Sequence, residues 1–367
     1  MTRVSPTAVL DGMGSCLPPR VLTNDDVRRR GVLETTDEWI RTRTGIARRR
    51  EAEEDTSTGD LAVAAGRAAQ QSAGARADLV LLATTTPDRR CPATAPEVAQ
   101  RLGLGTVPAF DLSAVCSGFL YGLAVATALI RTGLCTRPLV IGAETYSRII
   151  DPLDRDTAVI FGDGAGAVLL RAGDRGEPGA IAATDWGSDG TGSDLIAIAA
   201  GGSRQPDPAH RQSREEHYFR MRGREVYSQA VRRMTASSNA VLAKTGWQPA
   251  TIGAFIGHQA NQRILDSVAD RIGIPPNHRY GNLREVGNTA AASIPLALAD
   301  AAAHRRIRPG TPTLLTAFGG GLTWASAALT WPSARPFAHP PEPRTPQPTT
   351  RPTHRRNPSW NLSTTTS

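Results

Sequence analysis

Short apolar runs and longer amphipathic segments alternate along the first 335 residues of the chain. Runs rich in Val, Ile, Leu and Phe predict strands, and apolar positions that recur every three to four residues predict helices. The predicted strands are 79–83, 109–112, 139–142, 159–170, 252–257, 313–318 and 325–331. The predicted helices are 59–72, 117–132, 223–245, 261–272 and 290–304. Such alternation predicts an α/β layered fold with largely buried sheets.

The same pattern predicts how the chain is divided. A segment rich in Gly, Asp, Ser and Pro at 187–208 separates two stretches that each run strand, helix, strand, helix, strand. We therefore expect two lobes, 1–175 and 176–335. Residues 336–367 are mostly Pro, Thr, Ser and Arg, with too few apolar side chains to offset the entropy of ordering, so we expect a disordered tail there.

Composition bears on partners and location. A net charge of +8 and a pI near 10 raise nucleic acid as a partner. However, Lys244 is the sole lysine among 42 basic residues, and no nucleic-acid motif with interleaved aromatics is present, so we expect no such partner. Apolar stretches such as 118–130 are shorter than the roughly 20 residues that span a membrane, and no signal-peptide pattern is seen. These features predict a cytoplasmic protein that does not enter a membrane.

Four cysteines lack the paired spacing of a zinc site and the density of a disulfide scaffold, so we expect reduced thiols and no metal. Cys116 stands where a predicted strand ends and an apolar helix begins. The unpaired N–H groups and the positive dipole end of a helix stabilise a thiolate there, which makes this cysteine a candidate nucleophile. The alternative is a small buried core thiol, and this is what we expect of Cys16, Cys91 and Cys135.

Three further segments place suitable groups at strand ends or helix starts. His258, in FIGHQAN, could exchange a proton. Asn288 lies in a glycine-flanked turn before an alanine-rich helix, where it is either a helix cap or a site residue. Residues 319–321 are three glycines after a strand, which lets backbone N–H groups approach an oxyanion. GDGAG at 162–166 precedes a strand-like run, which argues against a nucleotide-binding loop.

Several segments are weak evidence when each is taken alone, but their combination, in this order along the chain, is specific. They are GMGSCLPPRVLTNDDV, TTDEWIRTRTGI, DLSAVCSGFLYG, DRDTAVIFGDGAGAVLL, GHQANQRI, GNTAAASIPLAL and AFGGGLTWASAAL. This combination resembles the β-ketoacyl-acyl-carrier-protein synthase III family over about Val9 to Trp331. The resemblance implies the thiolase fold, with two similar lobes that form a layered α-β-α-β-α sandwich, and a homodimer.

The resemblance also implies a catalytic triad of Cys116, His258 and Asn288. In the first half-reaction the Cys116 thiolate would attack an acyl-coenzyme A thioester and form an acyl-enzyme. In the second, malonyl-acyl carrier protein would lose carbon dioxide while His258 and Asn288 hydrogen-bond the enolate oxygen, and the carbanion would attack the acyl group. The backbone N–H groups of Cys116 and Gly320 would form the oxyanion hole. Acyl-coenzyme A is a substrate here, so no cofactor is implied.

Binding residues follow from the same motifs. For coenzyme A, the resemblance implies that Trp39 stacks on the adenine with Arg155 on the opposite face, that Arg43 and Thr35 lie nearby, and that Asn261 hydrogen-bonds the pantetheine.

The resemblance also implies that Arg263 and Arg271, which lie on roughly the same face of one helix, contact the carrier protein. Ser228 stands where relatives often have a basic residue. Cys91 stands where fatty-acid initiators commonly carry a large aromatic that reaches the acyl pocket of the dimer partner. A smaller side chain predicts a starter larger than acetyl.

Other functions remain open at this stage. The enzyme could initiate either fatty-acid or polyketide synthesis. A thiolase-fold acyltransferase would use Cys116 without forming a carbon–carbon bond. A non-catalytic subunit would only bind the carrier protein.

Overall fold

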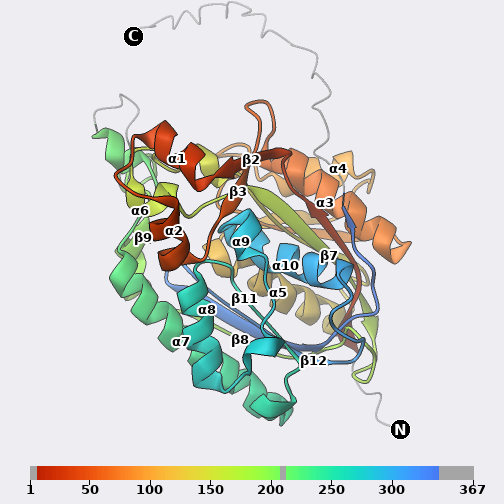
Figure 1. The fold of residues 1–367 in the computed structure, drawn as a ribbon. Helices are drawn as coiled ribbons and strands as arrows, with labels where there is room; N and C mark the ends of the chain where they lie inside the picture. The colour runs from red at the N-terminus through yellow and green to blue at the C-terminus, as the bar shows by residue number, and fades with distance from the viewer. Residues whose placement is uncertain (1–5, 207–211, 339–367) are drawn as a thin grey trace, which may run out of the picture.

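The computed structural model describes residues 6–206 and 212–338, arranged in stacked layers of helices and sheets (Figure 1). The first sheet has the strand order β14-β1-β7-β6-β4-β5. Its strands are β1 (Thr7–Cys16), β4 (Leu79–Ala83), β5 (Ala109–Leu112), β6 (Pro138–Glu144), β7 (Gly164–Gly173) and β14 (Phe337–Ala338). β4 pairs in parallel with both β5 and β6. The carboxyl ends of these three strands therefore meet at one end of the sheet, where ligands bind in open α/β sheets.

The second sheet has the strand order β11-β12-β13-β8. Its strands are β8 (Ile181–Ser188), β11 (Ala254–Gly257), β12 (Pro312–Gly319) and β13 (Thr323–Thr330). β11 and β12 are parallel, whereas β13 runs antiparallel to both of its neighbours.

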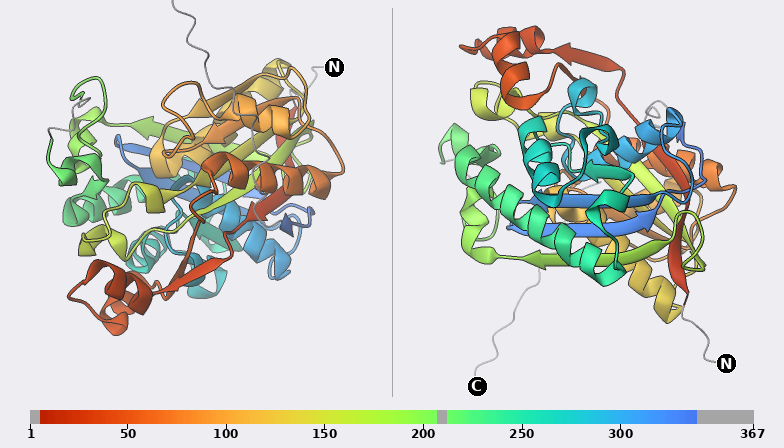
Figure 2. Two further views of the ribbon diagram at one scale, coloured as in Figure 1. Left: turned by 90° about the horizontal axis from the view of Figure 1, so that it is seen from above. Right: turned by 60° about the horizontal axis from the view of Figure 1, so that its bottom comes forward.

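Helices α5 (Gly118–Thr132) and α10 (Ser293–Ala303) lie between the two sheets, because their buried side chains belong to one core cluster with strand residues of both. Helices α3 (Thr58–Ala73) and α4 (Ala95–Arg101) cover the outer face of the first sheet. Helices α7 (Gly223–Thr245) and α8 (Gln262–Ile272) cover the second, and Figure 2 shows α7 lying across it. The expected layered α/β architecture is confirmed.

Shorter elements surround the layers. They are β2 (Arg20–Thr23), α1 (Asn24–Gly31), α2 (Asp37–Thr44), β3 (Arg48–Glu51), α6 (Arg155–Ala158), β9 (Ile196–Ala197), β10 (Arg220–Met221) and α9 (Leu283–Val286). Among the described residues, one helical stretch, Val115–Thr132, is long and apolar enough to cross a membrane, and more than half of it is buried within the fold. It contains the central helix α5, so its apolar composition is explained by its place in the core.

Close contact between α3 and β1 explains two glycines in the strand. A Cβ at Gly12 would lie 2.3 Å from the carbonyl oxygen of Ala69, and one at Gly14 would lie 2.3 Å from that of Ala65. These carbonyls belong to α3, so only glycine lets the helix lie this close to the strand.

Several predicted elements match the structure and one begins in the wrong place. Strands 79–83 and 109–112 and helix 223–245 have the predicted bounds. The strand predicted at 159–170 is wrong at its start, because α6 ends at Ala158 and β7 begins only at Gly164. The apolar residues 159–161, which lie between these two elements, are buried in the largest core cluster. Their apolar pattern is therefore explained by burial and does not indicate a strand.

The predicted tail is wrong at its beginning, because Phe337 and Ala338 pair with Gly14 and Ser15 as β14. The rest of that tail lies outside the described residues. The segment at 187–208, rich in Gly, Asp, Ser and Pro and expected to separate the two stretches, overlaps the end of β8. Residues 7–173 supply five strands of the first sheet and residues 181–330 supply the four strands of the second. The division into two lobes at residue 175 stays a prediction.

Candidate active site

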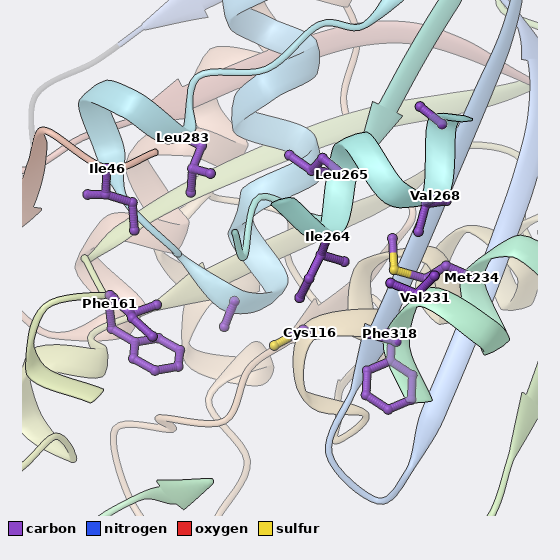
Figure 3. Packing of buried hydrophobic residues seen from close by; sticks show 14 of the residues in the cluster. Ile46, Cys116, Phe161, Val231, Met234, Ile264, Leu265, Val268, Leu283 and Phe318 are labelled. Atoms are coloured by element: carbon purple, nitrogen blue, oxygen red, sulfur yellow. The ribbon is translucent and has the colours of Figure 1, made fainter. Parts of the chain in front are cut away.

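A cavity of about 260 Å³ brings the three predicted catalytic side chains together. Cys116, His258 and Asn288 all line it, although they come from three distant parts of the chain. Apolar side chains make up much of its remaining wall, and Figure 3 shows the Cys116 sulfur among Phe161 and other apolar residues of this region. Such a wall excludes water from whatever reacts at the thiol.

Cys116 lies in a tight turn between β5 and α5. The turn Val115–Ser117 is a 3₁₀ helix, and Val115 has a φ of 46°, which is unusual for a β-branched residue. The predicted position between a strand and a helix start is thus confirmed. The expected stabilisation of the thiolate is not: burial, with a smaller contribution from Glu144, raises the pKa of Cys116 well above its ordinary value. Loss of hydration outweighs the helix N-terminus, so Cys116 rests as a thiol.

Glu144 is a functional candidate that the sequence reasoning missed. It ends β6 and is fully buried, and its Oε2 accepts hydrogen bonds from the Thr85 backbone N–H at 3.0 Å and from Thr86 Oγ1 at 2.9 Å. Burial raises the pKa of Glu144 to about 7. An acidic residue that closes the apolar run LVIGAE was the signal available in the sequence.

His258 follows β11, and a partner on another element sets its tautomer. Its Nδ1 lies 2.6 Å from Ser293 Oγ, and the same oxygen accepts the Gln259 backbone N–H at 3.3 Å. Because Ser293 Oγ already accepts this N–H, we assign its hydroxyl proton to the bond with Nδ1 and the ring proton to Nε2. Burial lowers the pKa of His258 to about 3, so the ring is neutral at pH 7. Ser293 was not singled out from the sequence.

A hydrogen bond to its side-chain oxygen fixes Asn288 in place. Its Oδ1 accepts the backbone N–H of Ala290 at 2.9 Å, and its own backbone pairs with Ile160 and Gly162. Because Oδ1 is used in this way, the Nδ2 amide is the group of Asn288 that can serve a ligand. Asn288 thus makes a hydrogen bond like that of a helix cap and also lines the cavity, although the sequence left these two roles as alternatives.

The glycine run after β12 packs directly against the nucleophile turn. A Cβ at Gly319 would lie 2.8 Å from Cys116 N and 3.0 Å from Ala114 O. Glycine is therefore required at the point of contact. Gly320, the predicted oxyanion donor, is the next residue along the chain.

Four of the five predicted coenzyme A residues line the same cavity: Trp39, Arg43, Arg155 and Asn261. The Trp39 side chain is 37% exposed, and the guanidinium carbons of Arg155 and Arg43 lie 5.2 Å and 5.7 Å from its ring centroid. Asn261 caps α8 by accepting the Arg263 backbone N–H at 2.9 Å and donates to Arg43 O at 3.1 Å. Two cations therefore flank one aromatic ring at the cavity wall.

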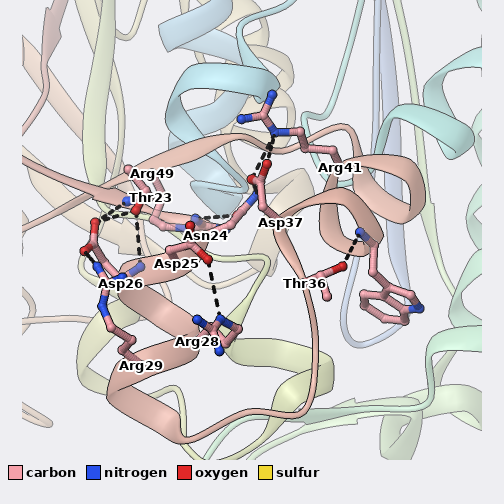
Figure 4. Close-up of polar contacts among 11 residues, drawn as sticks. Thr23, Asn24, Asp25, Asp26, Arg28, Arg29, Thr36, Asp37, Arg41 and Arg49 are labelled. Carbon is pink, nitrogen blue, oxygen red and sulfur yellow. Dashed lines mark hydrogen bonds and ion pairs between the residues drawn. The ribbon is translucent and has the colours of Figure 1, made fainter.

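A buried arginine ties the helix that carries Trp39 to the cavity wall. Arg49 Nη1 donates to Asn24 Oδ1 at 2.8 Å, and Asn24 Nδ2 donates to Asp37 Oδ1 at 2.8 Å, as Figure 4 shows. Arg49 Nη2 donates to Val159 O at 2.6 Å. Asp37 begins α2 and Val159 lines the cavity, so this network holds the two walls together.

The remaining predicted residues do not line this cavity. Arg263 and Arg271 are exposed on α8, and Cys91 is exposed on a loop before α4. The expectation of a core thiol is confirmed for Cys16 and Cys135 and is wrong for Cys91. Thr35 and Gly320 are likewise absent from the lining.

Comparison with known proteins gives a consistent result. Residues 110–190 match the family model "3-Oxoacyl-[acyl-carrier-protein (ACP)] synthase III", and residues 242–331 match its C-terminal counterpart. Beta-ketoacyl-[acyl-carrier-protein] synthase III 2 of Streptomyces coelicolor is 59% identical, over 90% of this chain and 95% of that protein. A synthase III of Pseudomonas aeruginosa is 50% identical, over 90% and 98% of the two chains.

Solved structures agree with the sequence matches. The 3-oxoacyl-(acyl carrier protein) synthase III of P. aeruginosa PAO1 superposes with a TM-score of 0.84 at 48% identity, covering 90% of this chain and all of that one. The priming β-ketosynthase of the R1128 polyketide pathway superposes with a TM-score of 0.83 at 33% identity, covering 90% and 98%. The fold around the cavity is that of these condensing enzymes.

Proposed function

The chain belongs to the β-ketoacyl-acyl-carrier-protein synthase III family, and from this premise we propose how its own residues carry the reaction. Enzymes of this family are acyltransferases that condense an acyl-coenzyme A starter with malonyl-acyl carrier protein. One observation supports the proposal above all. The Cys116 thiol lines one apolar cavity together with His258 and Asn288, and Trp39 and Arg155 lie in the wall of the same cavity. His258 Nδ1 and Asn288 Oδ1 already have hydrogen-bond partners, which leaves Nε2 and Nδ2 to donate to a substrate.

In the first half-reaction the Cys116 sulfur attacks the thioester carbonyl of acyl-coenzyme A. A new carbon–sulfur bond forms to Cys116, the bond to coenzyme A breaks, and the thiol proton leaves on the coenzyme A sulfur. The tetrahedral oxyanion accepts hydrogen bonds from the backbone N–H groups of Cys116 and Gly320. Because burial raises the pKa of Cys116, we propose that the proton departs during the attack and not before it.

In the second half-reaction malonyl-acyl carrier protein loses carbon dioxide in the same cavity. The enolate oxygen that develops accepts hydrogen bonds from His258 Nε2 and Asn288 Nδ2, and its carbon attacks the acyl group on Cys116. The carbon–carbon bond forms, the bond between the acyl carbon and the Cys116 sulfur breaks, and the thiolate takes up one proton from solvent. One such donor typically contributes ~3 kcal/mol to lowering the barrier. A neutral His258 holds its Nε2 proton throughout, as this role requires.

Substrate binding is proposed for the exposed parts of the same region. Adenine would stack on Trp39 with Arg155 on its opposite face, Arg43 and Thr35 would lie beside it, and Asn261 would hydrogen-bond the pantetheine. The exposed Arg263 and Arg271 of α8 would meet the acidic carrier protein. We also place the enzyme in the cytoplasm as a homodimer.

The decisive experiment is intact-protein mass spectrometry with a panel of acyl-coenzyme A thioesters, followed by addition of malonyl-acyl carrier protein. Wild type is expected to gain an acyl adduct that disappears as carbon dioxide and β-ketoacyl-carrier protein form. Cys116→Ala should gain no adduct, and Asn288→Ala should gain the adduct but retain it. An adduct that moves without release of carbon dioxide would favour the acyltransferase, and no adduct from any donor would favour a non-catalytic subunit.

The starter is proposed to be larger than acetyl, for example propionyl, butyryl or a branched acyl group, because Cys91 is small. Cys91→Phe should lower acylation by these longer donors relative to acetyl. Cys135→Ser, at a buried cysteine outside the cavity lining, is the matched control. Strict acetyl preference of the wild type would contradict the proposal. The adduct mass does not separate fatty-acid from polyketide initiation, which the identity of the cognate carrier protein would decide.

A further inference from the structure

We propose that Thr323 is a positioning residue for acylation, because its hydroxyl holds the two oxyanion N–H groups, those of Cys116 and Gly320, at a fixed separation. This inference rests on the proposed function. Thr323 is the first residue of β13 and lies in the segment AFGGGLTWASAAL, but the sequence pattern assigned it no role.

The Thr323 hydroxyl lies between the two segments that supply those N–H groups. Its Oγ1 is 3.0 Å from the carbonyl oxygen of Ala114 and 3.0 Å from that of Gly320. Ala114 precedes the nucleophile turn, and Gly320 is the second oxyanion residue itself. One hydroxyl therefore contacts a peptide group beside each donor.

Ser117 contacts the Thr323 hydroxyl from within the nucleophile turn. It follows Cys116 directly, is fully buried, and its hydroxyl lies 2.8 Å from Thr323 Oγ1. Each hydroxyl has one proton to give. Ser117 Oγ also lies 2.9 Å from Ala114 O. In the arrangement that links both segments, Ser117 donates to Thr323 Oγ1 and the single Thr323 proton is donated to Gly320 O. The nucleophile turn and the glycine run are thus joined by side chains as well as by packing.

Such a link benefits both segments, because one holds a β-branched residue in the left-handed region and the other is a run of conformationally free glycines. Val115 has a φ of 46° and Gly321 has a φ of 128°. A run of three glycines loses more entropy on ordering than any other sequence of its length. A misplacement of about 1 Å at a reacting centre costs up to roughly 100-fold in rate. Fixing these two N–H groups relative to each other is therefore worth a measurable part of the acylation rate.

The test compares three variants in single-turnover acylation, followed by mass spectrometry at several acyl-coenzyme A concentrations. Thr323→Val removes the hydroxyl and keeps the shape. It should lower the maximal acylation rate roughly ten-fold and leave KM for acyl-coenzyme A within about two-fold. Thr323→Ser should restore the rate to within about three-fold of wild type.

The matched control is Thr330→Val, at the opposite end of β13. The Thr330 hydroxyl donates to Glu177 O at 2.7 Å, so this variant also loses a hydroxyl-to-carbonyl bond of the same strand. We expect a similar fall in Tm and an unchanged acylation rate. If both valine variants slow acylation equally, Thr323 supports only the fold and the inference is wrong.

Ser117→Ala keeps the test decisive if Thr323→Val does not fold. It removes one side of the same link and should slow acylation about three-fold. A wild-type rate in Ser117→Ala or Thr323→Val, in an assay where wild type forms its adduct, overturns this inference and leaves the proposed function intact. Absence of the adduct in wild type itself would instead overturn the proposed function.

Discussion

Burial sets the protonation of the titratable side chains around the cavity. It raises the pKa of Cys116 and of Glu144 and lowers the pKa of His258, so each group favours its uncharged form. A neutral Cys116 thiol and a neutral His258 ring are suited to a reaction that creates charge transiently at the thiol, since fixed N–H donors then meet the developing oxyanion.

Glu144 should control the reactivity of the Cys116 thiol. Its negative charge raises the pKa of Cys116, so Glu144→Gln should lower that pKa and speed alkylation at a given alkaline pH. Because the pKa of Glu144 is about 7, the difference should grow as pH rises through 7 and be full above it.

Iodoacetamide alkylation followed by mass spectrometry measures this effect. Cys91 is exposed and would react as well, so both proteins should carry Cys91→Ala. Equal alkylation rates at pH 9 would show that Glu144 has no influence on the thiol.

Sequence patterns identified the proposed catalytic residues but not the side chains that orient them. Cys116, His258 and Asn288 were recognisable because each stands in a motif at a strand end or a turn. Ser293 contacts His258 across 35 residues of chain, and Thr323 contacts Ala114 across 209. Hydroxyl residues are common in any chain, so only the packing of α10 and β13 reveals which ones are used.

At the level of elements, the site depends on a close approach between β6 and the turn that begins α10. A Cβ at Gly142 would lie 2.3 Å from Ala291 O, a backbone atom that cannot move aside freely. Gly142→Ala should therefore destabilise the protein by roughly 2 kcal/mol.

Urea unfolding of the two variants Gly142→Ala and Gly223→Ala would measure this. Gly223 begins α7, and a Cβ there would meet nothing within 4 Å, so its variant should change stability by less than about 0.5 kcal/mol. Equal stability of the two variants would mean that the turn before α10 adjusts without cost.

The bounds of a strand or helix were predictable where one pattern of apolar residues extended over the whole element. The uniformly apolar β4 and the regularly amphipathic α7 have their predicted bounds. β1 was missed because Gly12 and Gly14 weaken its strand signal, although they are what lets α3 lie against it. β8 was missed because it is only partly buried and runs into a Gly-rich segment.

At the scale of the whole molecule, the site lies between the two sheets. Cys116 follows β5 of the first sheet, whereas His258 follows β11 of the second. The helix start that carries Ser293 lies between them. Neither sheet with its own helices would bring the three proposed catalytic residues together, so the packing of the two sheets against α5 and α10 forms the site.

The proposed homodimer would use a free sheet edge. β5 is the last strand of the first sheet, and its Phe110 is 39% exposed. Phe110→Glu should convert a dimer into a monomer in analytical ultracentrifugation, because a buried, unpaired charge would face the partner.

Phe337, on β14 at the opposite edge, is 49% exposed and supplies the matched control. Phe337→Glu should leave the dimer intact. Dissociation by Phe337→Glu alone would move the interface to the other edge, and a monomeric wild type would remove the homodimer from the proposal.

The short strand β14 has a consequence for how the protein is made. β1 is the first strand to leave the ribosome, and its partner β14 begins only at Phe337. The backbone of Gly14 and Ser15 on this side of β1 therefore stays unpaired until almost all of the described chain has been translated. Ribosomes that stop shortly before that point would release a sheet with an uncapped edge, so truncated products should be the species that co-aggregate during overexpression.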